Sequence, residues 1–231
     1  MDVLEAIKTR KSIRAFTDQE VSRETIEKIL ELSQRSPSGT NTQPWHVYVC
    51  TGSARQSITD DVLKLMTEGK GRNYEDYDYY PARWSDLHNA RRRAVGWGLY
   101  DLIGIEKGDR EAMMSQTARN FKFFDAPIGL FITTDAYLTL GSWADVGMYL
   151  QTIMLAARGF GLHTCPQAAW ISFQEPVFKH LGIPKDQMLV SGMSLGYADQ
   201  EAIENTLVSE REDIANVAHF CGFECSMKTM G

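Results

Sequence analysis

Three cations and a hydroxyl group lie within five residues near the start of the chain, in the segment Arg10-Lys11-Ser12-Ile13-Arg14. The apolar spacing of residues 3–7 predicts a short helix just before this segment. Guanidinium groups are planar and permanently charged, and serine adds a hydroxyl donor, so the set suits a phosphate group. Basic residues near the end of a helix also favour the helix dipole, and for the cluster alone this second interpretation stays open.

A second segment is dense in small polar side chains and backbone amides, Pro37-Ser38-Gly39-Thr40-Asn41-Thr42-Gln43-Pro44-Trp45. Such a loop can form many hydrogen bonds to a polyhydroxylated or heteroaromatic ligand. Its two prolines limit the conformational freedom of the loop, so less entropy is lost when a ligand binds. A plain connecting loop is the alternative interpretation.

A third feature is a run of aromatic residues among charges, at about residues 72–100. Tyr79, Tyr80 and Trp84 lie close together in it, with Pro81 between them. Clustered rings beside a cleft stack on flat ligands, so the segment is a candidate lid over an aromatic substrate. An amphipathic insertion that packs its aromatic rings on the body of the protein is the other interpretation.

The elements that must position these segments alternate between helices and strands. Ser22 is a predicted N-cap of a helix that runs to about Arg35, and residues 143–158 have the apolar spacing of a second long helix. Residues 46–50, 127–133 and 188–197 are predicted strands. Strands separated by helical segments indicate a mixed α/β arrangement. No early strand is followed by G-x-G-x-x-G, which argues against a Rossmann domain.

Length and charge narrow the class of protein. The chain has 231 residues, which fits one domain over residues 1–231, with 43% hydrophobic and 23% charged residues. The net charge of −6 argues against a general nucleic-acid surface. No run approaches the roughly 18 apolar residues of a membrane span, and the N-terminus lacks a signal core. We therefore expect neither a nucleic-acid nor a membrane partner.

The four cysteines do not form a metal motif. Cys221 and Cys225 are four residues apart, but no His or Cys pair lies at a spacing that would complete a tetrahedral zinc site. Cys50 and Cys165 fall in apolar, strand-like segments. We expect bystander thiols, no metal and a reducing, cytoplasmic setting.

The first two segments together resemble the nitroreductase family of flavin mononucleotide (FMN) enzymes. The family opens with R-[RH]-S-x-[RK]-x-[FY], matched here by residues 10–16, and continues some 25 residues later with P-S-[SG]-x-N-x-Q-P-W. Further markers of the family follow in order at residues 125–127, 145–147, 155–157, 161–166, 192–197, at Arg211 and at residues 220–223. The markers span almost the whole chain.

This resemblance implies an α+β fold with three layers, α/β/α, around a central mixed, largely antiparallel sheet. It also implies an obligate homodimer with FMN at the subunit interface. By position, Arg10, Ser12 and Arg211 would bind the flavin phosphate, while Lys11 would contribute mainly backbone contacts. Arg14 matches the basic residue near the N1/O2 edge of the flavin, where a fixed cation favours the negative charge of the reduced ring.

Two further segments match flavin contacts of the family. The residues that correspond to the loop at the ring and ribityl chain, partly from the partner subunit, are Pro37, Ser38, Gly39, Asn41 and Gln43. The segment whose backbone N–H faces flavin N5 corresponds to Pro166, Gln167, Ala168 and Ala169. The last two replace a Glu-Gly pair that is frequent in the family, so only a backbone role is expected there.

The resemblance implies an oxidoreductase in which NADH or NADPH reduces FMN at N5 and a nitroaromatic or similar electron-poor acceptor then takes the hydride. No catalytic side chain is expected, because the cofactor carries the chemistry. Alternatives on the same scaffold are a reductive dehalogenase, an enone reductase or a non-catalytic flavin-binding protein. The sequence leaves open the physiological acceptor and the choice between NADH and NADPH.

Overall fold

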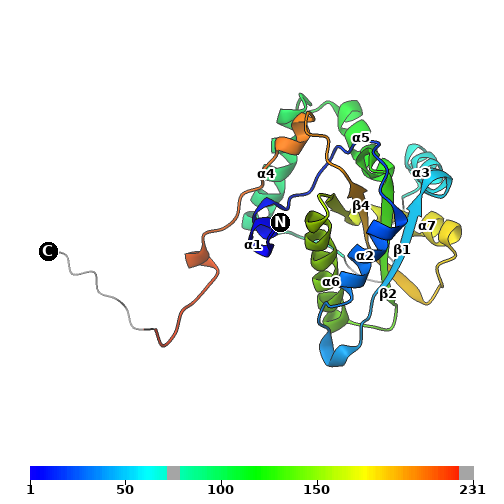
Figure 1. The fold of residues 1–231 in the computed structure, drawn as a ribbon. Coiled ribbons are helices and arrows are strands. Elements are labelled where there is room, and N and C mark those ends of the chain that lie inside the picture. Colours follow the sequence, from blue (N-terminus) through cyan, green and yellow to red (C-terminus); the bar gives the residue numbers. More distant parts are fainter. Residues whose placement is uncertain (72–78, 224–231) are drawn as a thin grey trace.

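The computed structural model describes residues 1–71 and 79–223 of the chain (Figure 1). Its centre is a sheet of four strands, β1 (His46–Thr51), β2 (Ile128–Asp135), β3 (His163–Gln167) and β4 (Gln187–Gly196). The strand order is β1-β2-β4-β3, and each neighbouring pair is antiparallel. A single parallel bridge between Ser12 and Thr164 extends the sheet beyond β3. The expected mixed, largely antiparallel sheet is confirmed.

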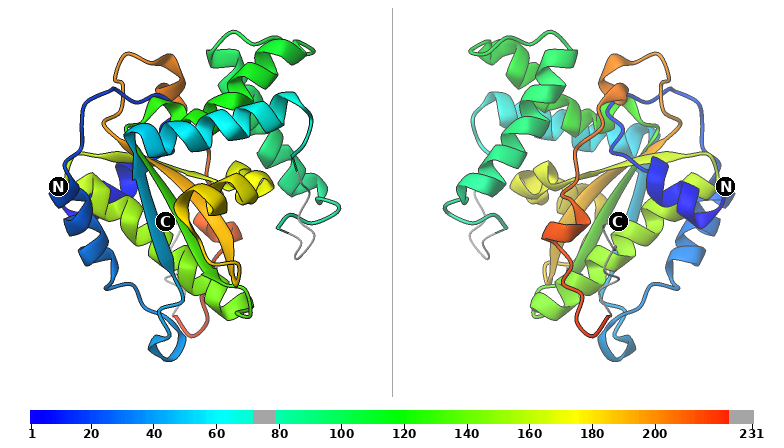
Figure 2. Two further views of the ribbon diagram at one scale, coloured as in Figure 1. Left: turned by 90° about the vertical axis from the view of Figure 1, so that its right-hand side faces the viewer. Right: turned by 90° about the vertical axis from the view of Figure 1, so that its left-hand side faces the viewer.

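Helices cover both faces of this sheet (Figures 1 and 2). One face carries α2 (Arg23–Ser33) and α6 (Leu140–Gly159), and the other carries α3 (Gly52–Thr67) and α7 (Gln174–Leu181). The short α1 (Val3–Thr9) packs on α6. Two further helices, α4 (Asp86–Leu102) and α5 (Arg110–Ala118), complete the set. The expected three-layer α/β/α fold is confirmed.

Strand β2 shows why the layers form. Ile128, Leu130 and Ile132 point into the hydrophobic cluster shared with α2 and α6, whereas Phe131 points into the cluster shared with α3 and α7. Successive side chains of a strand alternate between the two faces of a sheet. Because both faces are covered, the whole apolar run of β2 is buried.

Most predicted elements are present, with shifted ends. The Ser22 side chain accepts a hydrogen bond from the Thr25 N–H at 3.2 Å, as an N-cap should, and α2 ends at Ser33. Helix α6 begins at Leu140, three residues before the predicted start. Cys165 was expected in a strand-like segment, but no bounds of strand β3 were predicted, because it has only five residues and contains Pro166. Proline cannot donate to a ladder, but it is tolerated at a sheet edge, where β3 lies.

One arginine joins α1, α6 and β3. Arg158, in the last turn of α6, donates to the Leu162 carbonyl at 3.3 Å, to a ring nitrogen of His163 at 2.7 Å and to the Thr9 hydroxyl at 3.4 Å. The His163 ring nitrogen can accept only while the ring is neutral. Burial first, and then the charges of Arg158 and Lys11, lower the pKa of His163 to about 4. This junction fixes the end of α1, where the basic segment begins.

The junction predicts a pH dependence of stability. The folded-state pKa of His163 lies below its ordinary value of 6.5, so the unfolded chain binds the proton more readily. The contribution of His163 to stability is therefore present above pH 6.5 and is lost as the pH falls towards 4. In urea unfolding between about pH 7 and about pH 4.5, His163→Gln should lose less stability than the unmodified chain. Equal losses in both proteins would contradict this assignment.

Candidate functional site

The basic segment Arg10–Arg14 lies against strand β3. The Ile13 N–H donates to the Thr164 carbonyl at 3.1 Å, and Ser12 bridges Thr164 in parallel. Ile13 and Ala15 are buried, while Ser12 and Arg14 are only half-buried. This alternation keeps Ser12 and Arg14 partly accessible beside the buried Ile13 and Ala15. The first predicted cluster is thus adjacent to the strand that leads into residues 166–169.

Arg10 and Arg211 form an unneutralised pair of cations. The pKa of Arg10 is lowered by burial and, after burial, by the positive charge of Arg211. Among residues 1–71 and 79–223, neither guanidinium has a carboxylate partner within ion-pair distance. Arg211 instead donates to the carbonyls of Ser209 and Glu210, at 2.9 and 2.8 Å. An anion placed between the two guanidiniums would stabilise both charges.

Asn205 holds this arrangement together, and sequence reasoning missed it. Its buried side-chain oxygen accepts from the N–H groups of Arg14 and Ala15, at 2.8 and 3.2 Å. Its amide nitrogen donates to the carbonyls of Ala15 and Asp199, at 2.8 and 2.9 Å. The Lys11 ammonium donates to the Asn205 carbonyl. A lone Asn in a polar loop looks like any turn residue, so no pattern in the sequence indicated this role.

Cys165 is a residue of β3, and its thiol lies beside the Ser12 side chain. Burial raises the pKa of Cys165 to about 11, although the charges of Arg14 and Arg10 and the hydrogen bond with Ser12 act in the opposite direction. The thiol therefore stays protonated at neutral pH. Its neutrality leaves the charge of the nearby arginines uncompensated.

The segment Pro166–Ala169 forms the turn from β3 into the 3₁₀ helix η3 (Ala168–Phe173). Gln167 is buried, whereas Pro166, Ala168 and Ala169 are half-buried. No side chain of the described residues caps the start of η3. Ala168 and Ala169 pack against the core from a partly buried position, and their side chains are small. This geometry fits the backbone role that the resemblance implies.

The loop of residues 37–45 is clamped onto α6. The Gly39 N–H lies 3.2 Å from both carboxylate oxygens of Asp145, which is buried. At the other end of the loop, Trp45 stacks on the buried ring of Tyr149 with centroids 4.5 Å apart. The Trp45 ring N–H also donates to the Gln34 side chain at 3.2 Å. The loop is therefore held rigidly even though most of it is exposed.

The backbone of this loop is strained. Thr40, Asn41 and Gln43 have φ values of 48°, 60° and 47°, in the left-handed region that favours glycine. Such residues cost on the order of 1–3 kcal/mol each and occur mostly at functional sites. The Ser38 hydroxyl accepts from the Gln43 N–H at 3.0 Å, so it stabilises the loop internally. Gly39, Thr40, Asn41 and Gln43 are exposed.

Within one chain, the structure does not bring the loop to the basic cluster. The loop is bound at Asp145, near the start of α6, whereas the basic segment follows the junction at Arg158, near its end. These two positions are 13 residues apart, which is about 20 Å along a helix. Figure 1 shows the loop at the foot of the molecule and α1 well above it. The Arg10–Arg14 segment, Arg211 and residues 166–169 therefore form one group, and the loop forms another.

The aromatic segment contacts the body of the protein. Tyr79 lies 6.2 Å from Trp143 at the start of α6 and 4.8 Å from Tyr80, between ring centroids. Tyr80 lies 5.7 Å from Trp84, over which the Arg92 guanidinium stacks at 4.4 Å. Part of the predicted insertion, residues 72–78, lies outside the described residues. The contact with Trp143 agrees with the packing interpretation, and the half-exposed Tyr80 leaves an aromatic surface for a ligand.

The described part of the chain contains no group of three or more His, Cys, Asp or Glu residues that could hold a metal ion. Cys50 and Cys165 are buried free thiols, Cys221 is exposed, and Cys225 lies outside the described residues. None of the helices in that part is both long enough and apolar enough to cross a membrane. The site is thus built from arginines, hydroxyls and backbone amides.

Known proteins resemble this chain in sequence. The model of the Nitroreductase family matches residues 7–197. A 4-nitrobenzoate reductase from Nocardioides sp. strain LMS-CY is 39% identical over 198 residues, 84% of this chain and 80% of that protein. A nitrobenzene nitroreductase from Ectopseudomonas oleovorans is 38% identical over 215 residues, 93% of this chain and 94% of that protein.

Solved structures agree with these matches. The FMN and NADPH-dependent nitroreductase NfnB from Sphigopyxis sp. strain HMH has a TM-score of 0.93 and 37% identity, over 96% of this chain and 100% of that one. The FMN-dependent nitroreductase NfnB from Mycobacterium smegmatis, solved in complex with NADPH, has a TM-score of 0.89 and 30% identity, over 95% of this chain and 100% of that one. The family model and the likeness of sequence and fold show that this chain belongs to the nitroreductase family.

Proposed function

We propose that this chain is an NAD(P)H-dependent flavoenzyme that binds FMN and reduces nitroaromatic compounds. The observation that carries the proposal is the pair Arg10 and Arg211: burial and then the charge of Arg211 lower the pKa of Arg10, and among the described residues neither guanidinium has a carboxylate within ion-pair distance. A phosphate group would neutralise the two guanidiniums and accept a hydrogen bond from the Ser12 hydroxyl as well. We place the enzyme in the cytoplasm, where reduced thiols such as Cys50 and Cys165 persist.

The remaining residues of the group fit the flavin ring system. Bound FMN would supply the chemistry, acceptance of a hydride from NAD(P)H and its transfer to the acceptor. The Arg14 cation would favour negative charge at the N1/O2 edge of the ring. The N–H groups at Ala168 and Ala169 would orient the ring at N5. The NADPH dependence of the Sphigopyxis NfnB and the complex of the Mycobacterium smegmatis NfnB with NADPH support NADPH as the reductant here.

We propose that the loop of residues 37–43 reaches the flavin from a second copy of the chain. Its exposed amides lie at the far end of α6 from the Arg10–Arg14 segment of the same chain, so a homodimer would bring the two groups together. The molecule also exposes large apolar side chains on α1 and along the C-terminal segment, namely Val3, Leu4, Ile7, Val208, Ile214, Val217, Phe220 and Phe223. In Figure 1 the C-terminal segment runs away from the body. Exposed apolar surface of this extent marks an interface.

We propose that Tyr79, Tyr80 and Trp84 form the aromatic wall of the substrate site. Their rings are already in contact with one another and with Trp143. A nitroarene is flat and would stack on such a wall, parallel to the flavin, with a gain of about 0.5–1.5 kcal/mol per well-placed pair. Substrate selection would then depend on this segment, while flavin binding would not.

The proposed function predicts a two-stage reaction. Anaerobic addition of NADPH should bleach the flavin of the purified protein, and subsequent addition of nitrobenzene or 4-nitrobenzoate should restore its colour with formation of a reduced nitrogen product. Rapid mixing with an optical readout and product analysis measure both stages. Bleaching followed by turnover of a halophenol or an enone, but not of nitroarenes, would favour the other enzyme classes. If NADPH does not bleach the flavin, the result would favour a non-catalytic flavin-binding protein.

The same assay tests the aromatic wall. Trp84→Ala should raise the apparent KM for nitroarenes, or lower kcat, by about two- to tenfold, as expected for the loss of one stacked pair. The flavin content should stay the same, because the phosphate contacts lie elsewhere. Trp97→Ala, which removes an exposed ring of α4, is the matched control. Unchanged kinetics in Trp84→Ala and Tyr80→Ala would show that the segment only packs against the body.

The dimer has its own test. Sedimentation at micromolar protein concentration should show a dimer with one FMN per chain and no folded monomer, because the apolar surfaces of α1 and the C-terminal segment need a partner. Charged substitutions at Leu4 and Ile7 should lower the dimer fraction and release FMN together. A folded monomer that retains FMN and activity would overturn the proposal.

A further inference from the structure

Gln167 is a buried glutamine at the end of strand β3, and its side chain forms hydrogen bonds with other residues of the chain. Its oxygen accepts from the Ser194 hydroxyl at 2.8 Å and from the Trp170 ring N–H at 3.4 Å. Its amide nitrogen donates to the Asn120 carbonyl at 2.6 Å. Since the Trp170 ring can only donate and a carbonyl can only accept, the partners permit one orientation of the amide.

These three partners come from different elements. Ser194 lies in β4, Trp170 in η3, and Asn120 in the 3₁₀ helix η2 (Arg119–Asp125). One side chain thus joins the end of β3 to three neighbours. Only a group with both an acceptor and a donor, such as a carboxamide, can serve all three.

The partners themselves are immobile. Trp170 is fully buried and packs edge-on against Phe121 and Phe131, with centroids 5.2 and 5.0 Å away. Gly192 is opposite Gln167 in the ladder, and a Cβ atom there would lie 2.2 Å from the Trp170 ring. The indole thus occupies the space that any larger residue at Gly192 would need. The Gln167 oxygen therefore meets a fixed donor.

We propose that Gln167 is a positioning residue: its side chain fixes the turn at Ala168 and Ala169 and thereby sets the reduction potential of the bound flavin. The inference rests on the proposed function, in which the N–H groups of this turn meet flavin N5. Gln167 is the residue directly before the turn, so its peptide carbonyl and the Ala168 N–H belong to one rigid unit. Locking its side chain to three elements locks the direction of that N–H group.

The effect on the flavin has a definite sign. Oxidised N5 has a lone pair and accepts a hydrogen bond, whereas reduced N5 carries a hydrogen of its own. A well-aligned N–H donor therefore stabilises the oxidised form more than the reduced form. Losing the alignment should weaken binding of oxidised FMN, leave binding of reduced FMN nearly unchanged, and so raise the midpoint potential.

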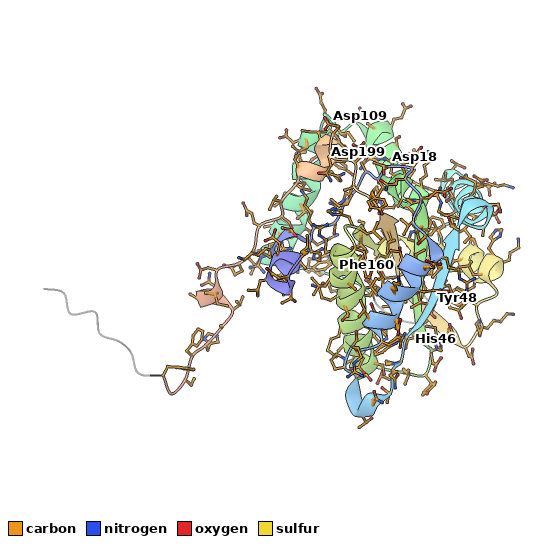
Figure 3. The ribbon with its side chains drawn as sticks, in the orientation of Figure 1. Asp18, His46, Tyr48, Asp109, Phe160 and Asp199 are labelled. Carbon is orange, nitrogen blue, oxygen red and sulfur yellow. The ribbon has the colours of Figure 1, made fainter. Side chains whose placement is uncertain are left out.

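Gln167→Met tests this, because methionine has a similar length but neither the acceptor nor the donor. Spectroelectrochemical titration should show about a tenfold loss of preference for oxidised FMN, which is a rise of about 30 mV for a two-electron couple. Gln187→Met is the matched control. The Gln187 oxygen also accepts from two hydroxyls, those of Tyr48 and Thr133, at 3.0 and 2.6 Å. Figure 3 labels Tyr48 on β1, the sheet edge opposite to β3.

Ser194→Ala provides a second, milder variant, because it removes one hydrogen bond of Gln167 and leaves the other two. It should raise the potential by less than Gln167→Met, and Gln187→Met should leave it unchanged. If Gln167→Met does not fold, the shift of the midpoint potential in Ser194→Ala tests the inference instead. Unchanged potentials in every folded variant of Gln167 and Ser194, or an equal shift in the control, would overturn the inference. If the unmodified protein binds no FMN, the proposed function itself fails.

Discussion

Two neighbouring cations, Arg10 and Arg211, which have no carboxylate within ion-pair distance among the described residues, are the constraint around which the proposed site is arranged. Burial and then the charge of Arg211 lower the pKa of Arg10, so its charged form is disfavoured in the folded chain. The nearby Cys165 stays a neutral thiol, so it does not offset these charges. A bound phosphate group, as proposed above, would offset them.

The surrounding elements converge on this pair from distant parts of the chain. Asn205 joins the basic segment to the polypeptide that leads to Arg211, and the Arg158 junction fixes the end of α1. Strand β3 then runs past the basic segment into the turn at Ala168. The residues proposed to bind the phosphate and those proposed to contact the flavin ring therefore lie on one continuous stretch of structure. The strained loop at Thr40 belongs to a separate body of contacts on α6, which is the physical reason to expect a second subunit at each site.

The candidate site residues could be predicted from the sequence better than the residues that hold them in place. The arginines and Ser12 stand out because charge and spacing are local properties, and β2 and α6 stand out because their apolar patterns are long. The bounds of strand β3 were not predicted, although Cys165 was expected in a strand-like segment, since the strand is short and contains Pro166. The roles of Asn205 and Gln167 depend on partners up to 194 residues away, so no local pattern can reveal them. The loop was predicted as a binding element, but its left-handed residues appear only in the structure.

The central claim is that Arg10 and Arg211 bind the phosphate of FMN, and a comparison of FMN with riboflavin, which lacks the phosphate, tests it directly. Two charge-assisted contacts worth roughly 1.5–3 kcal/mol each should make the protein bind FMN at least about 100-fold more tightly than riboflavin. Arg10→Ala and Arg211→Ala should each weaken FMN binding by about 10- to 100-fold and leave riboflavin binding unchanged. Arg23→Ala, at an exposed position of α2, should alter neither affinity. Equal losses of both ligands in the Arg10 and Arg211 variants, or no preference for FMN in the unmodified protein, would contradict the account.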